Sequence, residues 1–275
     1  MIRTSPEQKK EIIEAIQSGK DKIYRNEKVW NFLIADILSD PSFQKQFFTS
    51  ICDDSISINP NYDYDIWLES QPIPPRKGKS KASEGKTKLD IAFGSIKQRY
   101  NSGKSTKSGI EFDPENENGW ICFVEGKFKS ELSTRTTYDS CKNQLIRVIE
   151  NALCFQGDRQ APKKTYVVLL TPRAYQSKQE KNYYKIMKEC ENQDYILRSI
   201  KSSQFPERPP FNNWQYPNIA DRIKLLKKPN WVFYEMIIEK AYGIPKIDLT
   251  NLSDEEKIYL KKILNNLAKK LEESI

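Results

Sequence analysis

Residues 89–93 read LDIAF and residues 120–127 read WICFVEGK, and these two stretches decide the fold. Each contains a short apolar run, which predicts a buried strand. The first run carries Asp90 near its start, and the second ends in Glu125 and Lys127. Successive side chains of a strand point to opposite faces, so Glu125 and Lys127 share one face. Because buried charges are costly unless they are paired or bind a metal, these residues indicate a functional site.

The Glu-x-Lys spacing is a weak signal by itself, because glutamate and lysine are abundant in this chain. It occurs four times, and three occurrences lie in polar surroundings where a solvated charge pair is expected. Only the pair at 125 and 127 follows five consecutive apolar residues, which places it at the end of a buried strand. The occurrences are Glu7/Lys9, Glu84/Lys86, Glu125/Lys127 and Glu255/Lys257.

The composition narrows the possible functions. The chain has 275 residues, of which 37% are apolar and 30% charged, and its formal net charge is +8 with a pI near 9.0. This length fits one elaborated domain or a domain with an appendage. A basic balance suits a polyanionic partner such as nucleic acid. Histidine is absent, which excludes catalytic triads and nucleases with a histidine base as well as His-ligated zinc.

Cysteine use and hydropathy give further limits. The five cysteines form no Cys-x-x-Cys pair, which argues against a thiolate metal site and favours a reducing compartment. Cys122 lies in an apolar run and is predicted to be a small core residue. The sequence has no apolar stretch long enough to span a bilayer and no signal-peptide pattern, so we expect a cytoplasmic protein without membrane contact. Hard oxygen ligation of Mg²⁺ or Mn²⁺ remains available.

The order of the predicted elements indicates the fold class. Helical spacing predicts helices at residues 6–18, 43–51 and 140–153, and one that Asn26 caps and that continues to Leu38. Strands are predicted at 55–58, 64–69, 89–93, 120–125 and 166–170. Strands in succession, then a helix, then a buried strand predict an α/β (α+β) fold, with a central mixed β-sheet flanked by helices.

Two long polar insertions interrupt this core, at residues 72–88 and 97–119. Loops of this length are usually functional or disordered. The first is strongly basic, so it is either a solvated loop or an arm that neutralises DNA phosphates. The candidate DNA-contacting residues in it are Arg76, Lys77, Lys79, Lys81 and Lys86.

The rest of the chain divides around this core. We expect an N-terminal helical segment at 1–25, the core at 26–200, a Pro- and aromatic-rich connector at 201–229, and a helical C-terminal extension at 230–275. Leucines at 260, 264, 267 and 271 form a stripe on the last helix. That stripe either forms a homodimer or lies against the domain.

With these residues in place, the chain resembles the PD-(D/E)xK nuclease superfamily, the restriction-endonuclease-like fold, over roughly residues 26–172. Asp90 is similar to the first metal-binding aspartate of that family, and Glu125-Gly126-Lys127 is similar to its Glu-x-Lys. Glu27 resembles the glutamate at the head of the first core helix, and Gln144 resembles the glutamine on the helix after the Glu-x-Lys strand. The chain departs from the pattern in having Leu89 where a proline often precedes the aspartate. It also has a longer gap than usual between Asp90 and Glu125.

The chemistry of these residues is coherent without the resemblance. Asp90 and Glu125 could ligate one or two Mg²⁺ ions (Mn²⁺ may substitute) that activate a water at a phosphodiester. Lys127 would stabilise the developing charge and help orient or deprotonate that water, or it only pairs with Glu125. Glu27 either completes the metal shell or only caps its helix. Gln144 either positions water or a phosphate or is a core-facing amide; Glu69 and Glu131 are further candidates.

The predicted function is therefore a Mg²⁺-dependent DNA endonuclease, in a restriction or other microbial defence system that supplies a possible partner protein. Double-stranded DNA is the favoured substrate, and the resemblance implies products with 5′-phosphates. Two alternatives stay open at this point: a non-catalytic DNA-binding or scaffold subunit of a defence or transposition complex, and an RNA or single-strand nuclease with the same site.

Overall fold

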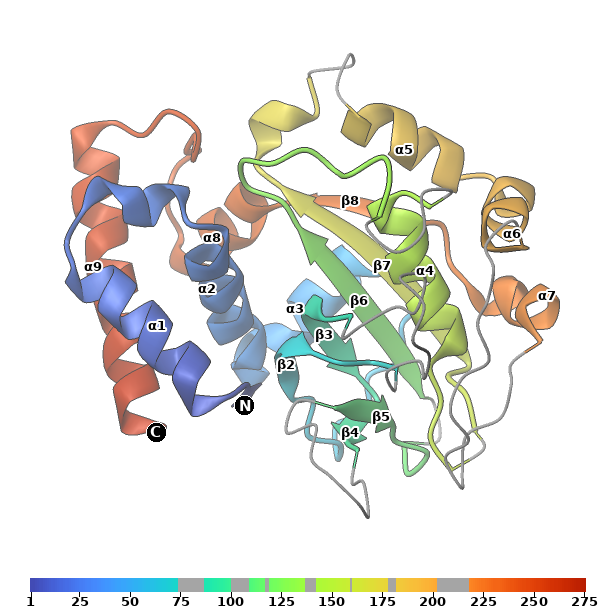
Figure 1. Cartoon of the computed structure of the whole chain (residues 1–275). Coiled ribbons are helices and arrows are strands. Elements are labelled where there is room, and N and C mark those ends of the chain that lie inside the picture. The colour runs from blue at the N-terminus through green and yellow to red at the C-terminus, as the bar shows by residue number, and fades with distance from the viewer. Residues whose placement is uncertain are drawn as a thin grey trace, which may run out of the picture.

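A six-stranded mixed sheet lies at the centre of the molecule (Figure 1). The strand order is β1-β2-β3-β6-β7-β8. β3 is antiparallel to β2 and to β6, whereas β6, β7 and β8 are mutually parallel and β1 is parallel to β2. The strands are β1 (Ile2–Arg3), β2 (Ile66–Ser70), β3 (Leu89–Gly94), β6 (Trp120–Gly126), β7 (Lys164–Thr171) and β8 (Asn230–Phe233). The predicted mixed sheet flanked by helices is thus confirmed.

The computed structural model describes residues 1–73, 87–99, 109–116, 119–136, 142–158, 160–177, 182–201 and 218–275. Within these ranges, no helix combines the length and the apolar character that a bilayer crossing needs. The four cysteines in these ranges are all free and buried, and Cys122 is a core residue as predicted.

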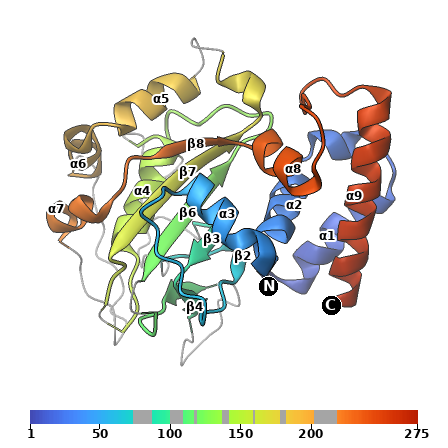
Figure 2. The ribbon, with the colours of Figure 1, turned by 180° about the vertical axis from the view of Figure 1, so that it is seen from behind.

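Helices cover both faces of the sheet (Figures 1 and 2). One face packs against an inner group of helices, α2, α3 and α8, and an outer pair, α1 and α9, packs outside that inner group. The members on this side are α1 (Pro6–Gln17), α2 (Glu27–Ser39), α3 (Pro41–Ile51), α8 (Tyr234–Tyr242) and α9 (Asp254–Glu273). The opposite face packs against α4 (Gln144–Cys154), α5 (Asn182–Cys190) and α6 (Gln193–Lys201), with α7 (Ile219–Arg222) beside α4. Short 3₁₀ turns join some of these elements: η1 (Asp21–Arg25), η2 (Arg173–Tyr175) and η3 (Ile223–Leu225).

Capping side chains mark the first residues of several helices, and Asn26 caps α2 as the sequence predicted, whereas α4 begins at Gln144 rather than at residue 140. Asn26 accepts a hydrogen bond from the Lys28 N–H (3.0 Å) and so caps α2. Asn143 caps α4 in the same way, through the Ile146 N–H at 2.8 Å. α9 begins with a complete capping box formed by Ser253 and Glu256. These caps fix where α2 and α4 begin, which is what positions their first side chains.

The leucine stripe of the last helix is used inside the chain. Leu260, Leu264, Leu267 and Leu271 are all buried, and α9 packs against α1 and α2. Of the two outcomes expected for the stripe, the structure therefore has the helix lying against its own domain, and the stripe offers no surface for a homodimer.

Three local predictions are wrong, each for a physical reason. Residues 55–58 form no strand, because side chains bind their backbone: the Trp120 indole N–H donates to the Ser57 carbonyl (2.9 Å), and the Lys164 ammonium donates to that of Ser55. The insertion at 97–119 is not only loop, since β4 (Ile96–Gln98) and β5 (Ile110–Phe112) pair as a small antiparallel sheet. The extension from residue 230 begins with β8, which completes the central sheet beside β7 before the chain turns helical.

Candidate active site

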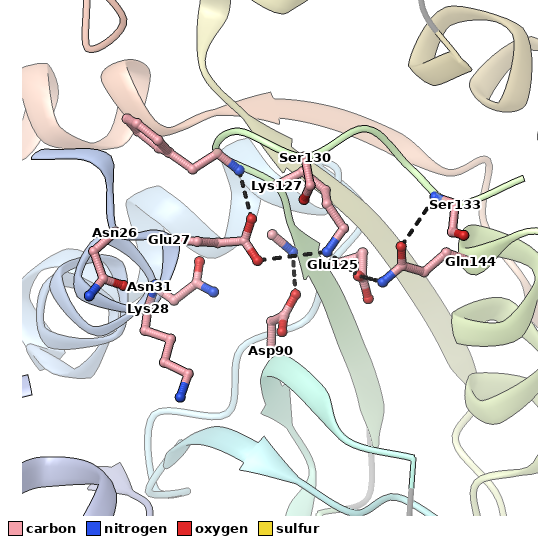
Figure 3. A network of polar contacts seen from close by, with 12 residues as sticks. Asn26, Glu27, Lys28, Asn31, Asp90, Glu125, Lys127, Ser130, Ser133 and Gln144 are labelled. Atoms are coloured by element: carbon pink, nitrogen blue, oxygen red, sulfur yellow. Dashed lines mark hydrogen bonds and ion pairs between the residues drawn. The ribbon is translucent and has the colours of Figure 1, made fainter. Parts of the chain in front are cut away.

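The charged residues that the sequence singled out meet at one end of the central strand β6 (Figure 3). β3 and β6 pair with Ile91 opposite Val124 and Ala92 opposite Phe123. The same register, continued by one residue, places Asp90 beside Glu125 across the two strands. Lys127 follows Glu125 on the same face, as strand alternation predicted.

Glu125 and Lys127 form a buried ion pair. The Lys127 ammonium lies 2.8 Å from the Glu125 carboxylate, and the two residues are only 7% and 4% exposed, respectively. Burial raises the pKa of Glu125 above its ordinary value, although Lys127 opposes that shift. Burial by itself lowers the pKa of Lys127, but the carboxylates of Glu125, Asp90 and Glu27 outweigh it and raise that pKa. Lys127 is therefore a firmly held cation inside a ring of carboxylates.

Asp90 is anchored by a backbone hydrogen bond. One of its carboxylate oxygens accepts a hydrogen bond from the Gly126 N–H at 2.8 Å. Burial and the nearby Glu125 carboxylate raise the pKa of Asp90 well above its ordinary value. The half-buried carboxylate of Asp90 and the buried one of Glu125 repel each other, and a divalent cation between them would relieve that repulsion.

Glu27 reaches the cluster from the first residue of α2. One of its oxygens accepts a hydrogen bond from the Phe128 N–H (2.8 Å), and the other lies 3.7 Å from the Lys127 ammonium. The side chain thus ties the start of α2 to the segment that follows β6. The sequence predicted that Glu27 either completes a metal shell or caps its helix. The link between α2 and the segment after β6 is a third role, which the sequence did not indicate.

Gln144, the first residue of α4, also contacts the cluster. Its side-chain amide donates to a Glu125 carboxylate oxygen, and its carbonyl oxygen accepts from the Ser133 N–H at 3.4 Å. Gln144 therefore faces the site and orients Glu125. Arg147, one helical turn further along α4, acts electrostatically on Glu125 and donates to the Thr87 hydroxyl at 2.6 Å. Sequence reasoning missed Arg147, although its i, i+3 spacing from Gln144 on a helix could have indicated it.

The residue between Glu125 and Lys127 has to be glycine. A Cβ atom on Gly126 would lie 2.6 Å from Asn31 Oδ1 and 2.7 Å from the Tyr234 hydroxyl. These two groups are themselves joined, since the Tyr234 O–H donates to Asn31 Oδ1 at 2.7 Å. Asn31 and Tyr234 come from α2 and α8, and they close the floor of the site behind β6. Nothing in the local sequence around Glu125 pointed to them.

The other candidate residues differ in their relation to the cluster. Glu69 lies beside Asp90 in the register of β2 and β3, has a positive φ of 48°, and is 3.7 Å from the Lys88 ammonium. Glu131 accepts a hydrogen bond from the Asn182 amide at 2.9 Å. The basic candidates Arg76, Lys77, Lys79, Lys81 and Lys86 lie outside the described residues.

The donor chemistry fits a magnesium ion held by few protein ligands. Among the residues that the structure describes, no three acidic or cysteine side chains converge on one cation position, and the Lys127 ammonium lies between the carboxylates of Glu27 and Glu125. Asp90 and Glu125 remain as a pair of hard oxygen donors. Mg²⁺ commonly takes one or two carboxylates from a protein and completes its shell with water and substrate phosphate. Their burial and mutual repulsion make this pair suitable for such an ion.

The fold and the site define a class only broadly: a mixed α/β protein with a buried carboxylate and lysine cluster at the end of a central strand. Comparison with protein-family models, with curated proteins and with solved structures found no match in any of the three. The function therefore has to be argued from the cluster itself.

Proposed function

We propose that the protein is a Mg²⁺-dependent endonuclease that hydrolyses phosphodiester bonds in DNA. The observation that carries this proposal is the meeting of Asp90, Glu125 and Lys127 at the end of β6, where the half-buried carboxylate of Asp90 lies beside the buried pair of Glu125 and Lys127. A stabilising role does not explain such a cluster, because removing charges from water costs more than a pair usually returns. Phosphodiester hydrolysis uses all three groups.

Asp90 and Glu125 would hold the ion, which when bound supplies Lewis-acid polarisation of the scissile phosphate and an acidified water. The Gly126 N–H fixes the Asp90 carboxylate, and the Gln144 amide fixes that of Glu125. Both donors bind the charged form of the carboxylates, so they set the geometry before substrate arrives.

Lys127 serves as a positive charge rather than as a base. The carboxylates around it raise its pKa, so the side chain keeps its proton at neutral pH. A protonated ammonium next to the scissile phosphate stabilises the extra negative charge of the pentavalent state. The N-termini of α2 and α4, whose first residues Glu27 and Gln144 contact the cluster, add positive partial charge on the same side.

Two features favour DNA as the substrate. The formal net charge of +8 suits a polyanionic substrate, and the resemblance to the PD-(D/E)xK superfamily favours a DNA endonuclease of microbial defence. By the same resemblance, the products carry 5′-phosphates.

Incubation of supercoiled plasmid with the purified protein in Mg²⁺, Mn²⁺, Ca²⁺ or EDTA tests the proposal. Cleavage is expected with Mg²⁺ or Mn²⁺ and none with EDTA, and Asp90→Ala and Lys127→Ala should each abolish it. Asp194→Ala and Lys261→Ala, both at exposed positions, are the matched controls that should cut normally. If the plasmid is bound but never cut, the scaffold alternative replaces the nuclease. End-labelling of the products reports whether the 5′ ends carry phosphate.

A further inference from the structure

A basic pocket lies directly beside the candidate active site. Its volume is about 520 Å³, and η1, the segment after β6, η2 and the loop before α9 form its walls. Four cationic residues line it, against one acidic residue, Asp21. The cations are Lys22, Arg25, Lys129 and Lys257, and the aromatic residues of the wall are Tyr24, Phe128 and Tyr175.

The pocket shares two chain segments with the active site. Arg25 lies two residues before Glu27, and Lys129 lies two residues after Lys127. Two residues of chain span at most about 7 Å between Cα atoms, so the backbone of the pocket wall lies within that distance of the backbone that carries Glu27 and Lys127. Phe128 joins them, because its N–H donates to Glu27 while its side chain lines the pocket. The Tyr175 hydroxyl donates to the Phe128 carbonyl at 2.5 Å and so fixes this shared wall.

The charge of the pocket is not balanced from within. Within the part of the chain that the structure describes, none of Lys22, Arg25 and Lys129 forms an ion pair, and all three are exposed. Lys257 pairs only with the exposed Asp254, at 3.3 Å. Three cations gathered around a concave surface next to a phosphodiester-cleaving centre are suited to bind backbone phosphate.

We propose that this pocket receives an unpaired nucleotide adjoining the cleaved bond, so that the substrate is a nucleic acid with a single-stranded segment at the site of cleavage. This inference rests on the proposed function and names its substrate class. Lys22, Arg25 and Lys129 bind the neighbouring phosphates. The half-buried Tyr175 ring lines the pocket and stacks on Tyr183 with one face, and the base stacks on its other face. A pocket of about 520 Å³ is of the size that holds one small ligand, and it has no room for a base-paired duplex.

Fluorescence anisotropy on a catalytically inert Asp90→Asn background tests the pocket without any need for cleavage. The probes are a fluorescein-labelled DNA duplex with a single-stranded tail and the same duplex with blunt ends. Lys22→Glu, Arg25→Glu and Lys129→Glu are combined in one variant. The control carries Lys261→Glu, Lys262→Glu and Lys269→Glu, a matched charge reversal on the exposed side of α9. Thermal unfolding of both variants checks that they are folded.

The pocket variant should bind the tailed duplex about tenfold more weakly or worse, with a salt dependence shallower by about 2 in the logarithmic slope, as expected when three phosphate contacts are lost from a single strand. The blunt duplex and the control variant should change little. The proposal is overturned if the tailed probe binds the pocket variant unchanged, if both probes lose affinity equally, or if the control loses as much.

Cleavage assays on the tailed duplex as well as on the plasmid, with the wild type and Mg²⁺, separate this inference from the proposed function. Cleavage by the wild type together with unchanged binding by the pocket variant removes the pocket and leaves the nuclease. Binding that depends on the pocket, in a protein that never cuts, removes the nuclease and leaves a single-strand recognition site. Absence of binding to either probe overturns the pocket in any case.

Discussion

Asp90 is half-buried beside the buried carboxylate of Glu125, and it accepts a hydrogen bond from the backbone of Gly126. Such a placement destabilises the folded protein at neutral pH, because the charge is removed from water and repelled by Glu125. A residue that destabilises the fold in this way is expected to serve the function, because functional sites often lower the stability of a protein.

We therefore predict that Asp90→Asn stabilises the metal-free protein by about 0.5 to 2 kcal/mol at neutral pH, as neutralising a functional charge commonly does. The pKa of Asp90 is raised in the folded state. Its protonated form thus favours folding, and that contribution is lost as the pH rises from the ordinary carboxyl value through the raised one. The advantage of the variant should accordingly disappear at acid pH. Urea unfolding in EDTA at several pH values measures this, and a variant less stable than the wild type at neutral pH contradicts it.

Addition of a divalent ion should make the wild type more stable than Asp90→Asn. Mg²⁺, or Ca²⁺ as a non-catalytic substitute, binds the folded wild type and stabilises it by mass action. We expect the melting temperature of the wild type to rise with ion concentration and that of Asp90→Asn to stay nearly constant. Differential scanning fluorimetry with Asp194→Asn as the matched surface control gives the comparison. An equal rise in all three proteins would mean that the ion binds elsewhere.

Gly126 is the second residue whose identity follows from its surroundings. In Gly126→Ala, the new Cβ would have to displace Asn31 or Tyr234, which it would approach to 2.6 and 2.7 Å. We predict a loss of about 1 to 3 kcal/mol in the free energy of unfolding, the usual cost of overpacking. Cleavage should be lost as well, since Glu125 and Lys127 flank the position. Tyr234→Phe removes the contacting hydroxyl. The double variant Gly126→Ala/Tyr234→Phe should therefore lose less free energy of unfolding than the two single variants lose in total.

At the scale of elements, the two helix starts and the end of β6 do most to assemble the site. Asp90, Glu125 and Lys127 could be predicted because each lies in a short apolar run whose strand character is readable locally. Glu27 and Gln144 could be predicted as candidates only through the resemblance to the PD-(D/E)xK pattern, and the structure places each as the first residue of its helix. Their partners could not, since Phe128 lies 101 residues from Glu27 in the sequence.

The parts of the fold that escaped prediction depend on long-range pairing in the same way. β8 is a four-residue strand whose partner β7 lies 60 or more residues away, and it reads as the start of a helix. Residues 55–58 read as a strand, but side chains from Trp120 and Lys164 take their carbonyls. Asn31 and Tyr234 are 203 residues apart, and no local pattern could have joined them behind Gly126.

A buried carboxylate and the Arg173–Glu239 ion pair connect the end of β7 to the C-terminal helices. Glu235, at the start of α8, accepts hydrogen bonds from the Arg173 N–H (2.9 Å) and the Leu249 N–H (3.4 Å) and is fully buried. In Glu235→Gln, an NH₂ group replaces one of the two acceptor oxygens. One of the two buried N–H groups then faces another donor and loses its hydrogen bond. We predict a loss of about 1 to 3 kcal/mol in the free energy of unfolding. Glu255→Gln, an exposed residue in the first turn of α9, is the control that should change little.

At the scale of the whole molecule, the outer helices are part of the same core as the sheet. The cluster that includes Leu264 of α9 and Ile12 of α1 continues without interruption through Leu33 of α2 to Ile91 of β3. The outer helices also carry part of the basic pocket, through Lys257. The pocket and the carboxylate cluster should therefore form and be lost together, although the sequence suggested separate terminal segments.

This continuity predicts that the protein unfolds in one step. Leu264 is fully buried between α9 and its neighbours, so Leu264→Ala should lower the free energy of unfolding by about 2 to 5 kcal/mol. The loss should appear in the whole molecule: the transition followed by far-UV circular dichroism and that followed by fluorescence of buried tryptophans such as Trp30 and Trp120 should shift together. Asn265→Ala, on the exposed side of the same helix, should leave both transitions in place. If the two probes separated in Leu264→Ala, the outer helices would be an independent unit, and the pocket could be lost while the carboxylate cluster stayed folded.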